Sequence, residues 1–313
     1  MSLPRASVIV PAFNAAVTIG RTLDCLAAQD LSDPFEVIVV DDGSTDATVR
    51  IARGRGVTVL SQDHGGPGPA RNLGVASARG PVLAFTDADC YPTAGWLREG
   101  LEALGSADLV QGRVEADPEA SRGPYDRTVW VLRESGLYET ANLFVGRELF
   151  DRLGGFEDWL PARIGKPLAE DVWLGWRARR SGARTSFSDA ALVHHAVFSR
   201  RAHEYAAERL RLVYFPAMVR KMPELRGSFC YRKRFLSRRS AEFDLALAAA
   251  LAAVVLRHPA PLLAAAPYAR TAASRASNWG RYAPRILIAD TVADAVGFAA
   301  LAVGSVRQRA LVL

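Results

Sequence analysis

The sequence predicts an α/β fold in which a mostly parallel sheet is flanked by helices, followed by a helical C-terminal region. Two observations support this prediction. Short apolar or β-branched runs alternate strictly with segments of helical periodicity through roughly the first hundred residues. Much later, the run 245–256 consists only of Ala, Leu and Val and starts a different, helix-rich pattern. We therefore expect an α/β domain over residues 1–200 and a basic and apolar helical region over 201–313.

The first four strands and helices are expected from these runs. Strict alternation implies right-handed crossovers, with helices on both faces of the sheet. In such sheets, ligands bind beyond the carboxyl ends of the strands. The expected strands are 7–10, 37–40, 57–60 and 82–85, and the expected helices are 18–29, 46–53, 69–78 and 93–104.

Composition excludes some classes of protein. The chain has 313 residues, half of them apolar, which is enough for a sizeable core and unlike a disordered protein. Cys25, Cys90 and Cys230 are too few and too scattered for a disulfide framework, which indicates a reducing cytosol. The first thirteen residues contain no signal-peptide pattern.

The net charge points to anionic partners. The formal charge is +6, and the run 220–239 holds eight Arg or Lys residues against one Glu. This run has neither a recognised nucleic-acid-binding fold nor interleaved aromatic residues, so we expect no nucleic-acid role.

Polar residues follow three of the expected strands at the same edge of the sheet. They are Pro11–Asn14 after the first strand, Asp41 and Asp42 after the second, and Asp87 and Asp89 after the fourth. Each cluster alone is explained by turn formation and helix capping. Three such clusters at one edge favour a ligand site.

The chemistry of these acids suggests a nucleotide. Asp87 and Asp89 can bind a divalent cation that bridges phosphates. Asp42 would repel a phosphate, but its carboxylate accepts hydrogen bonds from a pyrimidine imide or ribose hydroxyls, so we expect it to face the nucleoside.

The segment GGPGPARN, residues 65–72, is not one of the usual phosphate loops. It lacks the G-x-x-x-x-G-K-[ST] pattern and the third glycine of the dinucleotide fingerprint. Two interpretations remain open for Arg71. It points at a diphosphate or at Asp87 and Asp89, or it is a surface residue at the start of a helix.

Several stretches together resemble the inverting family 2 glycosyltransferases, which have the GT-A (nucleotide-diphospho-sugar transferase) fold. The resemblance covers residues 6 to about 195 in order and spacing. It is carried by SVIVPAFNAAVTIGRTLDCLAAQ, FEVIVVDDGSTDAT, GGPGPARNLGVASARGPVLAFTDADC, ANLFVGRELFDRLGGFED, LAEDVWLGWRARRSG and DAALVHH.

The resemblance implies roles for residues on the donor side. Asp42 matches the position that contacts the base, and Asp87 and Asp89 match the D-x-D motif, with Asp89 as metal ligand. A histidine of the VHH segment, His194 or His195, completes the metal site, and we favour His194. The donor-binding residues expected in all are Pro11, Ala12, Phe13, Asn14, Asp42, Arg71 and Asp87.

The resemblance also implies residues around the acceptor. Asp171 matches the general base, and Asn142 and Gly155 match positions on the acceptor side, where we also place Glu170 and Trp173. Other interpretations are helix capping for Glu170 and Asp171, and packing for at least one of Trp173 and Trp176.

The implied reaction is a single displacement at the anomeric carbon, in which one carboxylate removes the acceptor proton. A divalent cation, Mn²⁺ or Mg²⁺, and Arg71 stabilise the leaving nucleoside diphosphate, so no second acid is required. A UDP-sugar is the favoured donor, and a glycan or lipid-linked hydroxyl is the expected acceptor. The alternative is a catalytically silent scaffold of the same fold that binds nucleotide sugars or membranes.

The C-terminal region contains two long apolar segments. The run 245–256 is shorter than a bilayer span and is followed by prolines, so it predicts either an interfacial hairpin or a helix buried against the core. Residues 286–306 are long enough to span, but Asp290 and Asp294 lie one turn apart and favour an amphipathic helix.

Beside the basic run, these segments suggest peripheral attachment to the inner face of the cell membrane, with the protein in the cytoplasm. A helical dimer interface or an extra helical layer is the competing interpretation, and the sequence predicts no oligomeric state. The Q-x-x-R-W signature of processive synthases is absent, so we expect transfer of a single sugar.

Overall fold

The computed structural model describes residues 3–161 and 168–313 and divides into two compact units, each described here by itself. The first unit contains residues 3–121 and the described residues of 128–198. The second contains 122–127 and 199–313. The short segment 122–127 therefore groups with the helical unit, although no sequence pattern indicates this.

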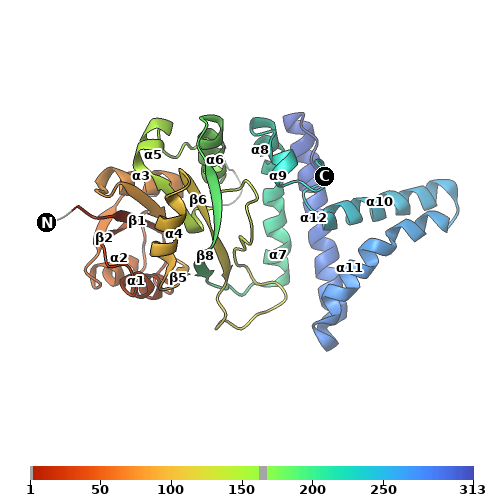
Figure 1. Ribbon diagram of the computed structural model, residues 1–313. Helices are drawn as coiled ribbons and strands as arrows, with labels where there is room; N and C mark the ends of the chain where they lie inside the picture. Colours follow the sequence, from red (N-terminus) through yellow and green to blue (C-terminus); the bar gives the residue numbers. More distant parts are fainter. Residues whose placement is uncertain (1–2, 162–167) are drawn as a thin grey trace. The chain divides into compact units, whose positions relative to one another are not determined.

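The first unit is built on one eight-stranded sheet with the order β3-β2-β1-β4-β7-β6-β8-β5 (Figure 1). The strands β1 to β4 are parallel and confirm the four predicted strands, whereas β7 and β5 run antiparallel to their neighbours. The bounds are β1 Ala6–Ala12, β2 Phe35–Asp41, β3 Thr58–Ser61, β4 Val82–Phe85, β5 Cys90–Pro92, β6 Leu109–Ala116, β7 Leu143–Gly146 and β8 Thr185–His195.

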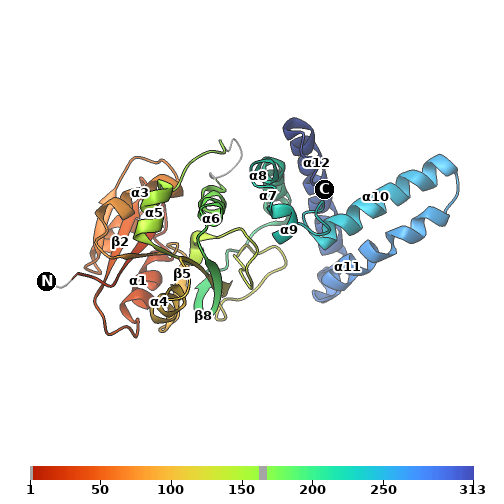
Figure 2. The same cartoon turned by 45° about the horizontal axis from the view of Figure 1, so that its top comes forward.

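Helices cover both faces of this sheet, as Figure 2 shows with α3 and α5 on one face and α1 and α4 on the other. Alternate side chains of the strands account for the two layers, because successive residues of a strand point to opposite faces. Val8, Val10 and Val39 belong to the core cluster that includes residues of α1 and α4, and Ile38 and Val40 pack with Ala70 of α3.

Helices α1 to α4 reproduce the four predicted helices within a few residues, and further helical elements follow in the first unit. The helical elements of this unit are α1 Ile19–Ala27, α2 Thr48–Arg53, α3 Pro67–Ser77, α4 Trp96–Leu104, the 3-10 turn η1 Thr140–Asn142, α5 Arg147–Leu153 and α6 Glu170–Arg180. The α/β class and the mostly parallel sheet are thus confirmed.

Gly74 fixes the distance between α3 and the sheet. A Cβ atom at this position would lie 2.7 Å from Cγ2 of Ile9 and 3.1 Å from Cγ2 of Val40, so a larger residue would push the helix outward. Arg71 lies three residues earlier, on the same side of α3. The close approach at Gly74 therefore holds Arg71 near the strand ends.

The second unit is helical. Its elements are α7 Ala202–Glu208, η2 Arg209–Tyr214, α8 Phe215–Lys221, α9 Leu225–Ser228, α10 Arg238–Leu256, η3 Ala260–Ala265, α11 Ala266–Ser277, η4 Gly280–Tyr282 and α12 Ala283–Gln308. Helix α12 packs against α7, η2, α8 and α11, and α10 pairs with η3 and α11 as a hairpin.

Helix α12 is the one described helix that is long and apolar enough to cross a membrane, with a mean hydropathy of 1.9 in its most apolar window. Its two acids lie inside the unit. Asp290 is fully buried and pairs with Arg275 at 2.6 Å, and Asp294 pairs with Arg239 at 2.7 Å. These ion pairs and the packing of α12 account for acids on an otherwise apolar helix.

The predicted run 245–256 forms most of α10. Of the two interpretations given above, a helix buried against the core is wrong, because Leu251, Val254, Val255 and Leu256 are each at least 65% exposed. The run forms one arm of a hairpin instead.

Candidate functional site

The carboxyl ends of β1, β2 and β4 bring the three predicted polar clusters to one edge of the sheet. Residues Pro11 and Ala12 end β1, Asp41 ends β2, and Asp87 and Asp89 follow β4. The loop after β1 is tied to the loop after β2, because the backbone N–H of Asn14 donates to Ser44 Oγ at 2.9 Å. Asn14 has a positive φ of 48°, and its side chain accepts from the backbone N–H of Thr45.

Asp42 is buried, and both oxygens of its carboxylate already accept hydrogen bonds from protein donors. Oδ1 accepts from Gln62 Nε2 at 2.7 Å and from the N–H of Gly65 at 2.8 Å. Oδ2 accepts from the N–H of Gly66 at 2.9 Å and lies 2.9 Å from His64 Nδ1. The expectation that Asp42 faces the nucleoside remains a prediction, and these protein donors already use part of the capacity of its carboxylate. In this structure the carboxylate organises the loop between β3 and α3.

That loop presents two residues that our sequence reasoning missed, Gln62 and His64. The His64 ring stacks on Phe13 with a centroid distance of 4.2 Å, and both side chains are well exposed. The same edge-of-sheet argument, applied to the third strand, would have identified them, because they follow β3 directly. An exposed pair of rings at a strand end is a surface on which a planar base can stack.

Arg71 joins the acids after β4 to the acids at the start of α6. It is only 4% exposed, and its guanidinium donates to Asp87 Oδ1 at 2.7 Å and to Glu170 Oε1 at 3.1 Å. The surface interpretation of Arg71 is therefore wrong. The contact with Asp87 was one of the two predicted targets, whereas the ion pair with Glu170 was not predicted.

Arg71 keeps one unused donor. Among the described residues, its Nε–H has no hydrogen-bond acceptor although it is buried. A buried unsatisfied donor costs about 1–3 kcal/mol and usually has a functional reason. This N–H group adds to the positive potential between the acids after β4 and the acids at the start of α6.

Asp171 begins α6 beside this pair. The chain enters α6 through Ala169 with a left-handed φ of 71°, and Asp171 Oδ1 accepts from the N–H of Val172 at 2.7 Å. Burial raises the pKa of Asp171 well above its ordinary value; the charge of Glu170 raises it further, and Arg71 opposes both effects. An aspartate with a raised pKa is a stronger proton acceptor than an exposed one.

Glu139 is a further carboxyl group in this environment. Burial raises its pKa to about 7, and its Oε2 has no hydrogen-bond partner among the described residues. Its charge also raises the pKa of Asp171. Tyr138, immediately before it, has a positive φ of 51° and is held against α6, where a Cβ at Gly175 would collide with the Tyr138 ring.

We expect the glutamine variant Glu139→Gln to flatten the pH dependence of stability. Because the folded-state pKa lies above the unfolded one, this group favours the folded protein at low pH, and that contribution is lost as pH rises through about 7. The loss amounts to about 3 kcal/mol. Unfolding by urea at pH 5 and pH 8.5 measures it. Glu102→Gln, at an exposed carboxyl, is the matched control, and an identical pH slope in wild type and Glu139→Gln would contradict the prediction.

His195 lies beside Asp89. Its Nε2 is 3.6 Å from Asp89 Oδ1, and β5 and β8 place Cys90 opposite His195 in the sheet. The Nδ1 atom lies 2.7 Å from the carbonyl oxygen of Ala196, which can only accept, so Nδ1 carries the proton. The lone pair of Nε2 is then directed toward Asp89, as in histidines that bind metal ions.

This placement corrects our preference for His194. Successive residues of a strand face opposite sides, so only one of the two histidines can reach Asp89. His194 pairs with Tyr91 in the sheet and interacts electrostatically with Asp117 on the other side.

Asp89, Cys90 and His195 have potential ligand atoms within 4.8 Å of one another. Burial raises the pKa of the Cys90 thiol well above its ordinary value, so it stays protonated and is a poor ligand for a hard cation. Asp89 and His195 supply an oxygen and a nitrogen, a donor set that suits Mn²⁺.

Two of the expected acceptor-side residues have structural roles. Asn142 is fully buried, donates to the carbonyls of Arg113 and Ala191, and accepts from Trp96 Nε1. Its side chain therefore does not line an acceptor site, which corrects that expectation. Gly155 is buried with φ of 73°, and a Cβ there would lie 2.7 Å from Asn72 Oδ1.

Glu170 and Trp173 lie on the first turn of α6. Glu170 is 7% exposed and is engaged by Arg71, so it positions that arginine. Trp173 is half-buried and donates to Glu157 Oε2 at 2.7 Å, which leaves part of its ring at the surface. Trp176 is buried and donates to the carbonyl of Gly136, so packing explains that residue.

Comparison with known proteins identifies the family. The family model described as Glycosyl transferase family 2 matches residues 7–156. The glycosyltransferase AglE of Haloferax volcanii is 33% identical over 62% of this chain and 67% of its own length. The chain is a member of glycosyl transferase family 2. This family 2 glycosyltransferase spans 27% or less of the length of two further curated relatives.

Solved structures support the fold. The mannosyltransferase PcManGT from Pyrobaculum calidifontis, in complex with GDP-Man and Mn²⁺, matches with a TM-score of 0.58 at 22% identity over 99% of this chain and 88% of its own. Residues 1–349 of S. aureus TarS, in complex with UDP-GlcNAc, match with a TM-score of 0.52 at 19% identity over 98% and 92%. The family 2 glycosyltransferase therefore has the predicted GT-A fold, and structural neighbours bind nucleotide sugars.

Proposed function

We propose that this enzyme transfers one sugar, with inversion, from a nucleoside-diphosphate sugar to a hydroxyl acceptor, and that Asp171 is the general base. One observation carries the proposal. Arg71 binds both Asp87, after β4, and Glu170, next to Asp171, so acids more than eighty residues apart in sequence form one cluster at the strand ends. This cluster supports a site in which the proposed donor-binding residues lie next to the proposed base.

The metal site belongs to the same proposal. Asp89 and His195 would hold a divalent cation, Mn²⁺ or Mg²⁺, which when bound neutralises charge on the diphosphate. Arg71, held near the acids of this loop by Asp87, adds a second fixed positive charge. Both favour departure of the nucleoside diphosphate without a proton donor.

The proton in this reaction moves to Asp171. As the acceptor oxygen forms its bond to the anomeric carbon, the bond to the diphosphate oxygen breaks and the acceptor hydroxyl proton passes to the Asp171 carboxylate. The raised pKa of Asp171 makes this transfer more favourable. The activity should increase with pH as Asp171 loses its proton.

The base of the donor is proposed to stack on Phe13 and His64. Asp42 ties down the loop after β3 that carries His64, and Phe13 belongs to the segment Pro11 to Asn14 after β1. UDP remains the favoured nucleotide. The acceptor is proposed to be a glycan or lipid-linked hydroxyl, reached by peripheral attachment of the enzyme to the inner face of the membrane.

Calorimetry with a panel of sugar nucleotides tests the proposal. We expect one donor to bind in the presence of Mn²⁺, to bind much more weakly after chelation, and to be hydrolysed slowly in the absence of acceptor. The competing function is a catalytically silent scaffold of the same fold. Absence of turnover with every donor, together with absence of metal-dependent donor binding, would contradict the proposed transfer and favour that scaffold.

The two histidines provide a matched pair of variants. We expect His195→Asn to weaken Mn²⁺ binding in the presence of UDP by about 10–100-fold, because a metal ligand is lost. His194→Asn, on the opposite side of β8, should bind Mn²⁺ like the wild type. Manganese titration followed by electron paramagnetic resonance measures both, and equal affinities in the two variants would remove His195 from the metal site.

A further inference from the structure

The hairpin formed by α10, η3 and α11 has an exposed apolar end. Between Leu245 and Pro267 the only charged residue is Arg257. The large apolar side chains at this end are highly exposed: Leu251 65%, Val254 75%, Val255 71%, Leu256 66%, Leu262 49% and Leu263 80%. Contiguous exposed apolar surface of this kind marks an interaction site.

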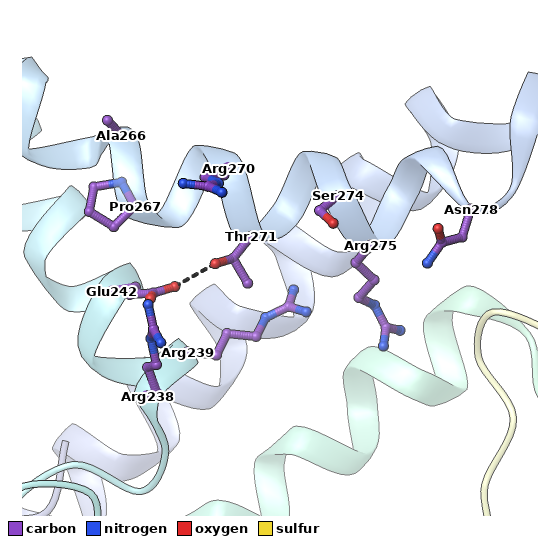
Figure 3. A pocket seen from close by; sticks show the side chains of 10 residues that line it. All are labelled: Arg238, Arg239, Glu242, Ala266, Pro267, Arg270, Thr271, Ser274, Arg275 and Asn278. Carbon is purple, nitrogen blue, oxygen red and sulfur yellow. Dashed lines mark hydrogen bonds and ion pairs between the residues drawn. The ribbon is translucent and has the colours of Figure 1, made fainter.

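A basic cleft lies on the same hairpin, where α10 and α11 separate (Figure 3). Its volume is about 1010 Å³. Side chains of α10 face those of α11 across it, and the polar groups that line it include Ser274 and Asn278. The charged residues of its lining are Arg238, Arg239, Arg270, Arg275 and Glu242.

The cleft has a surplus of positive charge. Its single acid, Glu242, forms an ion pair with Arg238 Nε at 2.8 Å and also accepts from Thr271 Oγ1 at 2.7 Å, so one acid faces four arginines. The Arg238 side chain is nonetheless 77% exposed. Among the described residues, Arg270 has no acidic partner and no hydrogen-bond acceptor.

The two remaining arginines are neutralised from α12. Arg275 pairs with Asp290, and Arg239 pairs with Asp294. They therefore form a fixed wall of the cleft. Arg270 is the cleft cation without an acidic partner among the described residues, and the exposed guanidinium of Arg238 still presents N–H groups to an anion beside its ion pair with Glu242. Arginine binds phosphate oxygens with two parallel hydrogen bonds, and hydroxyl and amide groups such as those of Ser274 and Asn278 can add further donors.

We propose that this cleft binds the headgroup phosphate of an anionic phospholipid while the apolar end of the hairpin lies in the adjoining acyl region of the bilayer. A lipid surface presents phosphates and apolar chains side by side, which matches the order of basic cleft and apolar end along one hairpin. A second copy of this chain is a poor occupant, because it carries a net charge of +6.

The hairpin lies along the interface and does not stand upright in the bilayer. Arg257, at the turn after α10, would otherwise be carried into the hydrocarbon. In the flat orientation its guanidinium reaches the headgroups while Leu256 and Leu263 are buried among the chains. The inference thus gives the proposed membrane attachment a specific element and a phosphate site, and it does not depend on sugar transfer.

Flotation of the full chain with vesicles tests the proposal. Vesicles of phosphatidylcholine alone are compared with vesicles in which about one third of the lipid is phosphatidylglycerol. The double variant Arg238→Ala/Arg270→Ala should bind the anionic vesicles roughly 30-fold more weakly, from the loss of two cations near the surface. The matched control Arg50→Ala/Arg53→Ala removes the same charge from exposed positions on α2 and should change binding less than about 3-fold.

A second pair of variants tests the contribution of the apolar end of the hairpin. Val255→Glu should reduce binding to both vesicle types, whereas Val17→Glu, at a 95% exposed position of the first unit, should not. The variant Arg238→Lys/Arg270→Lys keeps the charge and should retain most of the binding, which separates charge from folding.

Three results would overturn the proposal: equal losses in the cleft pair and the α2 pair, unchanged binding of the cleft pair, or binding of inorganic phosphate to the cleft without any binding to vesicles. Asp171→Asn should bind vesicles like the wild type. A failure of the proposed sugar transfer therefore leaves this test intact.

Discussion

Replacing Asp171 by asparagine is expected to reduce sugar transfer about 10³-fold while donor binding stays nearly unchanged. The loss follows from the removal of the proposed general base, since general base catalysis contributes about 10²–10⁴-fold. The amide is close in size to the carboxylate and retains an oxygen for the N–H of Val172. Initial rates at saturating donor, with donor affinity from calorimetry, separate the two effects.

The fold of this variant can be checked in the same preparation. Because burial and the charge of Glu170 raise the pKa of Asp171, its ionised form destabilises the folded protein, and this penalty grows as pH rises through the folded pKa. Asp171→Asn should therefore unfold at the same temperature as the wild type or higher at pH 8. Asp151→Asn, at an exposed position on α5, is the control. A variant that retains more than a tenth of wild-type activity would show that Asp171 is not the base.

Replacing Arg71 by methionine is expected to destabilise the first unit by about 3–5 kcal/mol, because Asp87 and the buried Glu170 lose their shared counter-charge. Methionine fills much of the same volume, so the loss is electrostatic and not a cavity effect. Unfolding by urea at pH 8 measures it.

Two further variants make this prediction specific. Arg71→Lys keeps the charge but presents a single ammonium group, which cannot reproduce the two-sided contact, so it should recover only part of the stability. Arg53→Met removes an exposed cation of α2 and should leave stability within about 0.5 kcal/mol of wild type. A loss below about 1 kcal/mol for Arg71→Met would mean that the two ion pairs of Arg71 contribute little to stability, contrary to the prediction.

Local sequence patterns predicted the first half of the sheet well. The runs around Val8, Val39 and Val59 are β-branched, and the first two are buried while the third is partly buried. Short loops connect the runs to helices, so periodicity and chain connectivity leave few alternatives. The antiparallel insertion of β7 between β4 and β6 was not predicted. It depends on pairings between residues far apart in the sequence, such as Leu83 with Val145 and Val110 with Phe144, which no local pattern records.

The candidate site was predictable in location and less so in detail. The position of the site at the carboxyl edge of the sheet followed from the predicted topology. The partners of individual side chains depend on distances that the sequence does not give. Asp42 was assigned to a nucleoside because a carboxylate accepts hydrogen bonds, and the structure shows that backbone N–H groups of Gly65 and Gly66 use part of that capacity. The choice between His194 and His195 required the register of β8 against β5.

The double contact of Arg71 has a consequence for how the substrates of this enzyme affect each other. Any ligand that changes the charge around Asp87 also changes how strongly Arg71 is drawn toward Glu170, and hence the proton affinity of the neighbouring Asp171. Such linkage is reciprocal for binding free energies. Donor and acceptor affinities should therefore be coupled through one guanidinium group, without any movement of the backbone.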